Sequence, residues 1–207
     1  MCTVAAEVID VDLAAVGRWF QEVAPGLVRE PPDVAAQTLA ERLECLDSRV
    51  GVEVGEIDGR RELVVTAGGD PSRFALVEAL CDVLVAPGWT VRALKPARGF
   101  AFALEAGELE IRGEDLTFEP LESRDAPGVL GIRIFAEDAL VEPLRALAWL
   151  VVETGIGERA AAHIRHLEVQ PTPLDARREL PIGELGRFVE WHRSRSAPAS
   201  LGAAGLA

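Results

Sequence analysis

Apolar and polar positions alternate with a period of two over residues 50–57, a second, apolar run follows within residues 62–67, and Asp58-Gly59 lies between the two runs. The alternation and the short apolar run predict two β-strands, and Asp-Gly is typical of a tight hairpin because glycine accepts a positive φ. Residues 70–85 then carry apolar side chains at helical spacing, and a third alternating run occupies 89–94. A strand–helix–strand crossover makes its two strands parallel. The pattern therefore predicts a ββαβ unit.

The rest of the chain is assigned from the same periodicities. Two helices are predicted before the unit, the first ending at Pro25-Gly26 because proline interrupts a helix interior. Four strands should follow the unit, with a hairpin turn at residues 113–115, and a helix should begin near Asp138 with Pro143 in or near its first turn. The predicted ranges are helices 10–23, 31–47, 138–153 and 181–193, and strands 99–104, 108–112, 116–120, 129–135 and 164–169.

The segment 63–94 recurs in pattern, though not in sequence, as 130–169. We therefore expect an α+β fold with a mixed, mostly antiparallel sheet, helices packed mainly on one face, and a pseudo-repeated ββαβ unit. Residues 1–48 are expected to form a helical segment packed on the main domain, residues 49–194 a single α+β domain, and residues 195–207 a disordered tail.

Charge narrows the classes of partner. The chain carries 34 acidic and 21 basic residues, for a net charge of −13, and Lys95 is its only lysine. Phosphate backbones and anionic membranes require clustered cations, so we expect no nucleic-acid and no membrane partner. Residues 105–144 hold 11 acidic and 3 basic residues. This stretch is interpreted as a solvated face that keeps the protein soluble, with a basic partner or a loosely held cation as the alternative.

The cysteines and the lengths of the apolar runs indicate in which cellular compartment the protein is expected. The longest uninterrupted apolar run, Ala146–Val152, has seven residues, whereas a membrane span needs about 20. The N-terminus lacks the basic residues of a signal peptide. The three cysteines Cys2, Cys45 and Cys81 are far apart and form no CxxC pair, which indicates reduced thiols in a cytoplasmic protein. We expect no cofactor.

Two places have the residue types of a binding site. Gly68-Gly69-Asp70-Pro71 follows a strand and opens a helix, where backbone N–H groups can hold an anion, with Arg73 and Lys95 as supporting cations. The stretch matches neither the dinucleotide nor the phosphate-loop motif, and Asp70 would compete for the same N–H groups. The interpretation as a structural turn is therefore favoured over an anion site at Gly68, Gly69, Arg73 and Lys95.

The second place is the pair of histidines His163 and His166. On a strand they point to opposite faces because they are three residues apart, so His166 with Glu168 is the candidate metal pair. No serine occupies a nucleophile elbow. The four tryptophans are predicted to be core anchors, and an exposed one would mark a binding groove.

Several phrases together resemble a family of uncharacterised bacterial proteins, a domain of unknown function. These are residues 62–70, Pro87-Gly88-Trp89, residues 115–118, Leu130-Gly131-Ile132, Gly157-Glu158 and Glu179-Leu180-Pro181. The similarity covers about residues 46–191. Thr117 departs from the family, in which that position is often aromatic. The resemblance implies no activity and no catalytic residue.

The function expected from these features is a non-enzymatic cytoplasmic module that binds a protein partner or forms a homodimer. The alternative hypothesis is a small metal-dependent hydrolase that uses His166 and nearby glutamates, including Glu168.

Overall fold

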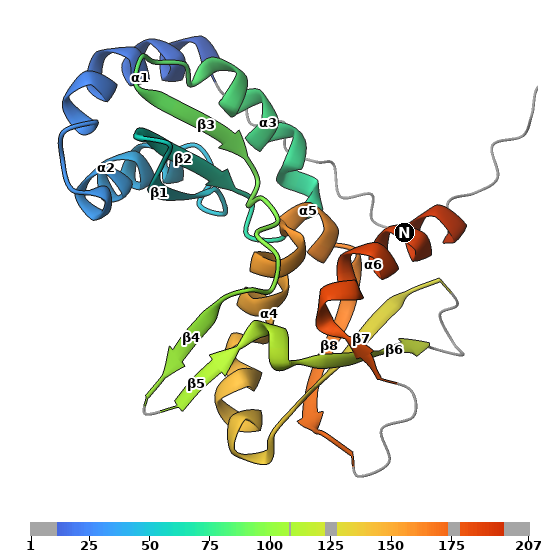
Figure 1. Ribbon diagram of the computed structural model, residues 1–207. Helices are drawn as coiled ribbons and strands as arrows, with labels where there is room; N and C mark the ends of the chain where they lie inside the picture. Colours follow the sequence, from blue (N-terminus) through green and yellow to red (C-terminus); the bar gives the residue numbers. More distant parts are fainter. Residues whose placement is uncertain (1–11, 108, 123–127, 174–178, 197–207) are drawn as a thin grey trace, which may run out of the picture. The chain divides into compact units, whose positions relative to one another are not determined.

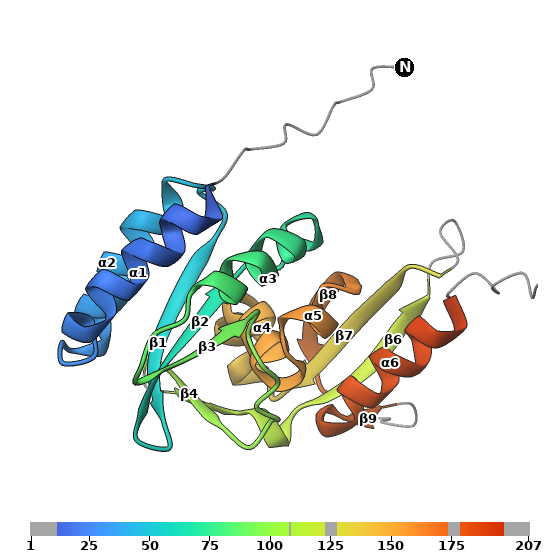
Figure 2. The same cartoon turned by 90° about the horizontal axis from the view of Figure 1, so that it is seen from above.

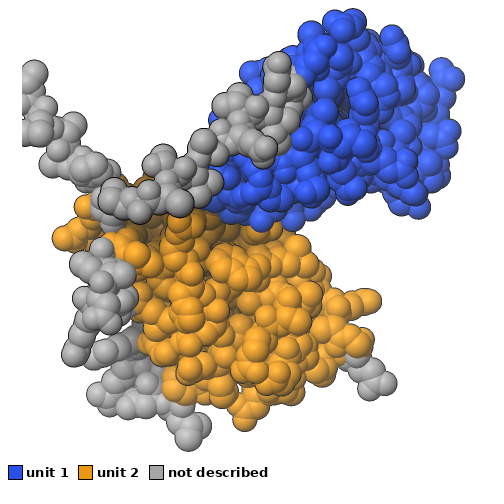
Figure 3. All heavy atoms as spheres, turned by 180° about the vertical axis from the view of Figure 1, so that it is seen from behind, with its two compact units in different colours: residues 1–96 blue, residues 97–207 orange. Residues whose placement is uncertain are grey.

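The computed structural model describes residues 12–107, 109–122, 128–173 and 179–196. The chain divides into two compact units, residues 1–96 and 97–207 (Figure 3). This division differs from the predicted boundaries at 48 and 194. The two N-terminal helices share one core with the first ββαβ unit, because α1 packs against α3 and α2 packs against β1. Residues 197–207 of the predicted tail lie outside the described residues, and the last helix includes residues 195 and 196.

The first unit contains a three-stranded sheet of order β1-β2-β3 (Figure 1). β1 and β2 are antiparallel, whereas β2 and β3 are parallel, as a crossover through α3 requires. Its elements are α1 (Leu13–Leu27), α2 (Pro32–Glu44), β1 (Gly51–Ile57), β2 (Arg60–Thr66), a 3-10 turn (Pro71–Arg73), α3 (Phe74–Val83) and β3 (Trp89–Ala93).

Local sequence signals explain most of these boundaries. Asp58 and Gly59 both have positive φ, of 50° and 70°, which confirms the predicted tight hairpin. Asp70 accepts a hydrogen bond from the backbone N–H of Ser72 at 2.9 Å and so caps the turn that leads into α3. Pro25 does not end α1 as predicted. The helix continues to Leu27 because tertiary contacts outweigh the local preference, including a hydrogen bond from the indole of Trp89 to the carbonyl of Ala24.

The second unit contains a four-stranded sheet of order β8-β7-β6-β9 and a separate β4–β5 hairpin. Figure 2 shows β6 and β7 as neighbouring strands with α6 beside them. The elements are β4 (Ala103–Ala106), β5 (Leu109–Arg112), β6 (Thr117–Glu122), β7 (Leu130–Ala136), α4 (Val141–Ile156), α5 (Glu158–Ala161), β8 (Ile164–Pro171), β9 (Leu180–Pro181) and α6 (Leu185–Ser196).

The mostly antiparallel α+β character is confirmed, but the strands within the described residues are distributed over three sheets instead of one. The predicted hairpin turn at residues 113–115 is wrong. These residues form a 3-10 turn that carries the chain from the β4–β5 hairpin into the larger sheet. Gly113 is required there, because a Cβ at this position would lie 2.5 Å from the carbonyl oxygen of Phe100.

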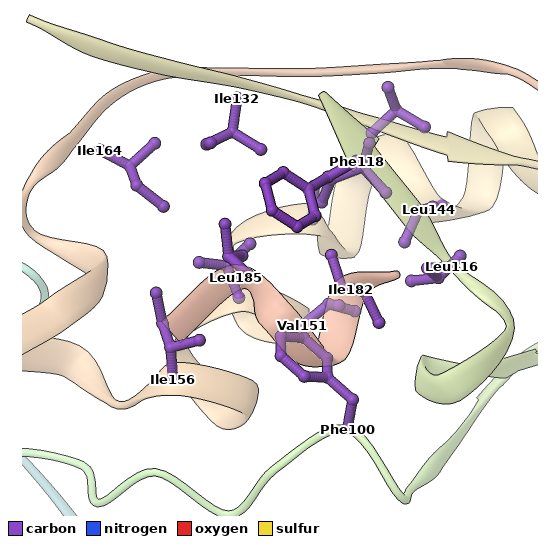
Figure 4. Packing of buried hydrophobic residues seen from close by; sticks show 14 of the residues in the cluster. Phe100, Leu116, Phe118, Ile132, Leu144, Val151, Ile156, Ile164, Ile182 and Leu185 are labelled. Atoms are coloured by element: carbon purple, nitrogen blue, oxygen red, sulfur yellow. The ribbon is translucent and has the colours of Figure 1, made fainter. Parts of the chain in front are cut away.

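The predicted repeat is confirmed in both units. β1-β2-α3-β3 and β6-β7-α4-β8 each consist of an antiparallel pair followed by a parallel crossover, with the strands in the same spatial order. In the second unit the inward face of the sheet contributes residues such as Phe118 and Ile132 to the main core, where they pack with Leu144, Val151 and Leu185 of the helices (Figure 4). The helices therefore cover one face of this sheet.

Candidate functional site

The cations of the predicted anion site are paired with carboxylates of the first unit. Arg73 Nε lies 2.6 Å from Asp47 Oδ2, and the Asp47 side chain is only 4% exposed. Lys95 Nζ lies 3.1 Å from Glu53 Oε1. Hydrogen bonds from the Ser72 side chain and backbone lower the pKa of Asp70, so a negative charge stands at the helix start. This arrangement favours a structural turn over an anion site.

Asp47 organises the polar contacts around that turn. Its Oδ1 also accepts a hydrogen bond from the Arg49 backbone N–H at 3.0 Å, and Arg49 Nη1 reaches Asp70 Oδ2 at 3.4 Å. The network joins the segment before β1 to the turn that follows β2. In this network the cations Arg49 and Arg73 are paired with the carboxylates Asp47 and Asp70. The cations near Gly68 and Gly69 are therefore neutralised by carboxylates and do not form a phosphate loop.

The predicted metal pair lies in the second unit, on β8. His166 Nε2 is 3.7 Å from Glu168 Oε2, so the two side chains share one face of the strand as expected. The other carboxylate oxygen of Glu168 accepts a hydrogen bond from Arg133 Nε on β7. Among the residues that the structure describes, no group of three or more His, Cys, Asp or Glu side chains could hold a metal ion.

His163 occupies a turn before β8 and is not on the strand. Partial burial lowers the pKa of His163, and the charges of Arg193, Arg165 and His192 lower it further. An environment of cations disfavours a metal ion. His163 therefore adds nothing to the pair formed by His166 and Glu168.

A bulge at Arg165 sets the faces of β8. Ile164 is opposite Leu130 on β7, while His166 is opposite the very next residue, Gly131, so Arg165 is the extra residue. Beyond the bulge, Leu167 and Val169 share the inward face with Ile164. His166, Glu168 and Gln170 share the outward face. Simple alternation from Ile164 would have placed Ile164 with His166 instead.

β8 is also an edge strand. In the part of the chain that the structure describes, it pairs with β7 and with no strand on its other side (Figure 1). Edge strands expose backbone donors and acceptors that can pair with another chain. The Arg165 bulge and Pro171 interrupt regular pairing at the two ends, so the regular part of this edge is the stretch 166–170.

A groove of about 330 Å³ runs between this edge and α4. Trp149 is 45% exposed and stands in its wall, and the neighbouring Leu150 is 42% exposed. The lining residues are Arg145, Ala148, Trp149, Leu167, Glu168, Val169 and Gln170. An open sheet edge and an exposed aromatic side chain thus lie together, and we call this surface the β8 groove.

Sequence reasoning placed Trp149 in the core, and this was wrong. Trp149 is two residues from Val151, whose side chain is fully buried, so it lies about 200° around the helix from that inward position. That angle was the available signal. Trp191 on α6 is also exposed, at 49%, whereas Trp89 is buried as predicted.

No protein family, curated protein or solved structure matches the chain. Of the helices in the described part of the chain, none is both long enough and apolar enough to cross a membrane.

Proposed function

We propose that this chain is a non-enzymatic, cytoplasmic protein-binding module that receives an extended segment of polypeptide along the outer edge of β8. The observation that carries the proposal is the β8 groove, in which an open strand edge adjoins a half-exposed tryptophan. The free thiols Cys45 and Cys81 support the cytoplasmic assignment.

The edge supplies the affinity that does not depend on sequence. A segment added to a sheet edge forms main-chain hydrogen bonds, and its alternate side chains enter pockets on either face. The stretch 166–170 is long enough to pair with a short strand. On the inward face, such a strand would place an apolar side chain against Leu167 and Trp149.

Trp149 supplies an anchor. Tryptophan is among the residues that contribute most to protein interfaces, because it buries a large apolar area and retains one hydrogen-bond donor. Trp149 is exposed on the apolar helix α4, so within the described part of the second unit no segment covers its ring completely. Arg145 and Gln170 give the groove a polar rim.

The alternative of a metal-dependent hydrolase rests on the contact between His166 and Glu168 alone. A catalytic zinc site uses three protein ligands and one open position. Arg133 engages the same carboxylate, and a cation so close opposes a second cation. The structure therefore favours the protein-binding function.

The proposal can be tested with displayed peptides. A library of random linear peptides is selected against the purified full chain at low protein concentration, and the affinity of the selected peptides is measured by fluorescence polarisation. The Trp149→Ala variant should bind them at least about tenfold more weakly, as expected for an aromatic anchor. Trp191→Ala is the matched control, because that tryptophan is equally exposed but on α6.

Peptides bound to β8 should also slow hydrogen exchange of the amides in residues 166–170. If a chain that is monomeric at the concentration used selects no peptide, or if Trp149→Ala and Trp191→Ala have the same effect, the β8 groove is not a binding site for extended polypeptide.

A further inference from the structure

We propose that the strand which pairs with β8 is β8 of a second copy, so that the protein is a two-fold homodimer with a sheet continuous across the interface. This inference rests on the function proposed above and names its occupant. A two-fold interface uses the same patch twice, so the patch must be complementary to itself. The β8 stretch meets this condition in one register.

Symmetry limits the registers that need to be considered. A two-fold axis perpendicular to a sheet keeps each face on its own side, so residues that are opposite each other must come from the same face. The axis must therefore pass beside a residue that pairs with its own copy. Within residues 166–170, each choice of that residue fixes every other pair.

An axis at Leu167 places His166 of each copy opposite Glu168 of the other. This contact occurs twice by symmetry, and both copies of it lie on the outward face. An axis at Glu168 would instead put two carboxylates opposite each other, and like charges in opposed positions destabilise a strand pair. An axis at Val169 would put Leu167 opposite Pro171, which has no backbone donor for the ladder. The register centred on Leu167 is therefore selected, because it places an imidazole and not a second carboxylate opposite each Glu168.

The side chains are already arranged for this exchange. Arg133 holds one carboxylate oxygen of Glu168, while the other oxygen, Oε2, lies near the chain's own His166 at 3.7 Å. Opposed Cβ atoms of antiparallel strands are about 4.5–5.5 Å apart, whereas two residues along one strand are separated by about 6.6 Å. The Cβ of His166 in a second copy would thus lie closer to the Cβ of Glu168 than the Cβ of His166 in the same chain does.

The inward face supplies the apolar part of the interface. Leu167 would meet Leu167 of the other copy at the axis, and each leucine would enter the mouth of the opposite β8 groove beside Trp149. Paired strands are about 4.8 Å apart, so the two α4 helices, which pack on their own β8 strands, would come within helix-packing range of one another. Trp149 would then be covered in the dimer.

The test uses the full chain with Cys2, Cys45 and Cys81 replaced by alanine, into which single cysteines are introduced. Leu167→Cys should form a covalent dimer under mild oxidation, because opposed residues have Cα atoms about 4.5–5.5 Å apart, within the span of a disulfide. Gln170→Cys is the matched control on the same strand. Its two copies would be about 20 Å apart in this register and should not cross-link.

Sedimentation of the wild-type chain over a wide concentration range gives a second, independent measurement, and it should show a reversible dimer. His166→Glu would oppose two carboxylates at both symmetric sites and should raise the dimer dissociation constant roughly tenfold. A wild-type chain that stays monomeric over the whole range overturns the inference, as does a Gln170→Cys variant that cross-links as readily as Leu167→Cys.

Failure here and failure of the proposed function give different results. If the chain is monomeric but binds selected peptides through Trp149, the proposed function stands and only the homodimer inference is overturned. A monomer that binds no peptide loses both.

Discussion

The aromatic ring of Phe100 occupies the space where Gly155 of α4 would otherwise carry a side chain. A Cβ built on Gly155 would overlap three ring atoms of Phe100, and even the farthest of them, Cε2, would be 2.6 Å away. Backbone hydrogen bonds from Arg98 to Thr154 and from Gly99 to Gly155 hold the segment before Phe100 against the end of the helix. Phe100 thereby enters the core of the second unit (Figure 4).

Gly155→Ala should therefore destabilise the second unit, by about 1–3 kcal/mol, because the ring has to move from a close-packed position. Gly26→Ala in α1 is the matched control, since nothing lies within 4 Å of a Cβ built there. The control should be neutral or more stable by up to about 1 kcal/mol, as alanine is the better helix former. Urea unfolding of both variants measures the difference. Equal stability of the two variants would show that Phe100 does not depend on this glycine.

Arg133 bridges three strands, and its loss should destabilise the sheet of the second unit. Its guanidinium donates to Glu119 on β6 and to Glu168 on β8, and the three side chains are each between 23% and 30% exposed. Arg133→Met should lower the free energy of unfolding by about 1–3 kcal/mol, because two charge-assisted hydrogen bonds are lost.

The control for Arg133 is Arg145→Met, which removes an exposed ion pair with Glu142. Exposed pairs of this kind contribute between about 0 and 1 kcal/mol. A similar loss of stability in both variants would mean that bridging the strands adds nothing to an ordinary surface pair. Chemical denaturation followed by circular dichroism separates the two cases.

The repeated ββαβ unit could be predicted because its signals are local. Asp58-Gly59 accepts the positive φ angles that its turn requires, and Asp70 with Pro71 caps the turn before α3 whatever the rest of the fold. The same holds for Pro143 in the first turn of α4. Such signals act within a few residues and need no knowledge of the rest of the fold.

The features that were missed depend on distant parts of the chain. β9 exists because Leu180 and Pro181 pair with β6, some 60 residues earlier. The Arg165 bulge contains no glycine from which it could have been predicted. Because of this bulge, Ile164 lies on the same face as Leu167 and not on the face of His166. The β8 groove needs both the edge position of β8 and the exposure of Trp149. Tertiary packing decides the order of the strands and which side of a helix faces solvent. The sequence could therefore indicate that an exposed tryptophan would mark a binding groove, but not which tryptophan is exposed or where the groove lies.

Cys81 should be unreactive in the folded protein. Burial raises the pKa of its thiol to about 12, and the nearby Asp82 and Glu78 act in the same direction. Cys45 is exposed. Because the thiolate is the nucleophile, iodoacetamide at pH 8 should modify Cys45 at least roughly a hundredfold faster than Cys81.

Peptide mapping by mass spectrometry gives the two alkylation rates. In urea the difference between Cys45 and Cys81 should disappear, because unfolding exposes both thiols. Comparable rates in the folded chain would show that Cys81 is accessible as a thiolate, contrary to its burial.

His163 should make the protein less stable as the solution becomes acidic. Partial burial and the cations Arg193, Arg165 and His192 lower the pKa of His163 below its ordinary value of 6.5. Between the folded and the unfolded pKa the unfolded chain binds more protons at this site, so stability rises with pH through the window just below 6.5 and the penalty is complete below the folded pKa. His163→Gln removes this contribution, so its stability relative to the wild-type chain should increase as the pH falls from 7 toward 5.

The direct measurement is the NMR titration of the His163 ring, whose midpoint should lie below 6.5 and should rise in Arg193→Gln. A midpoint at or above 6.5 in the wild-type chain would contradict the prediction, because the neighbouring cations would then not act on this ring.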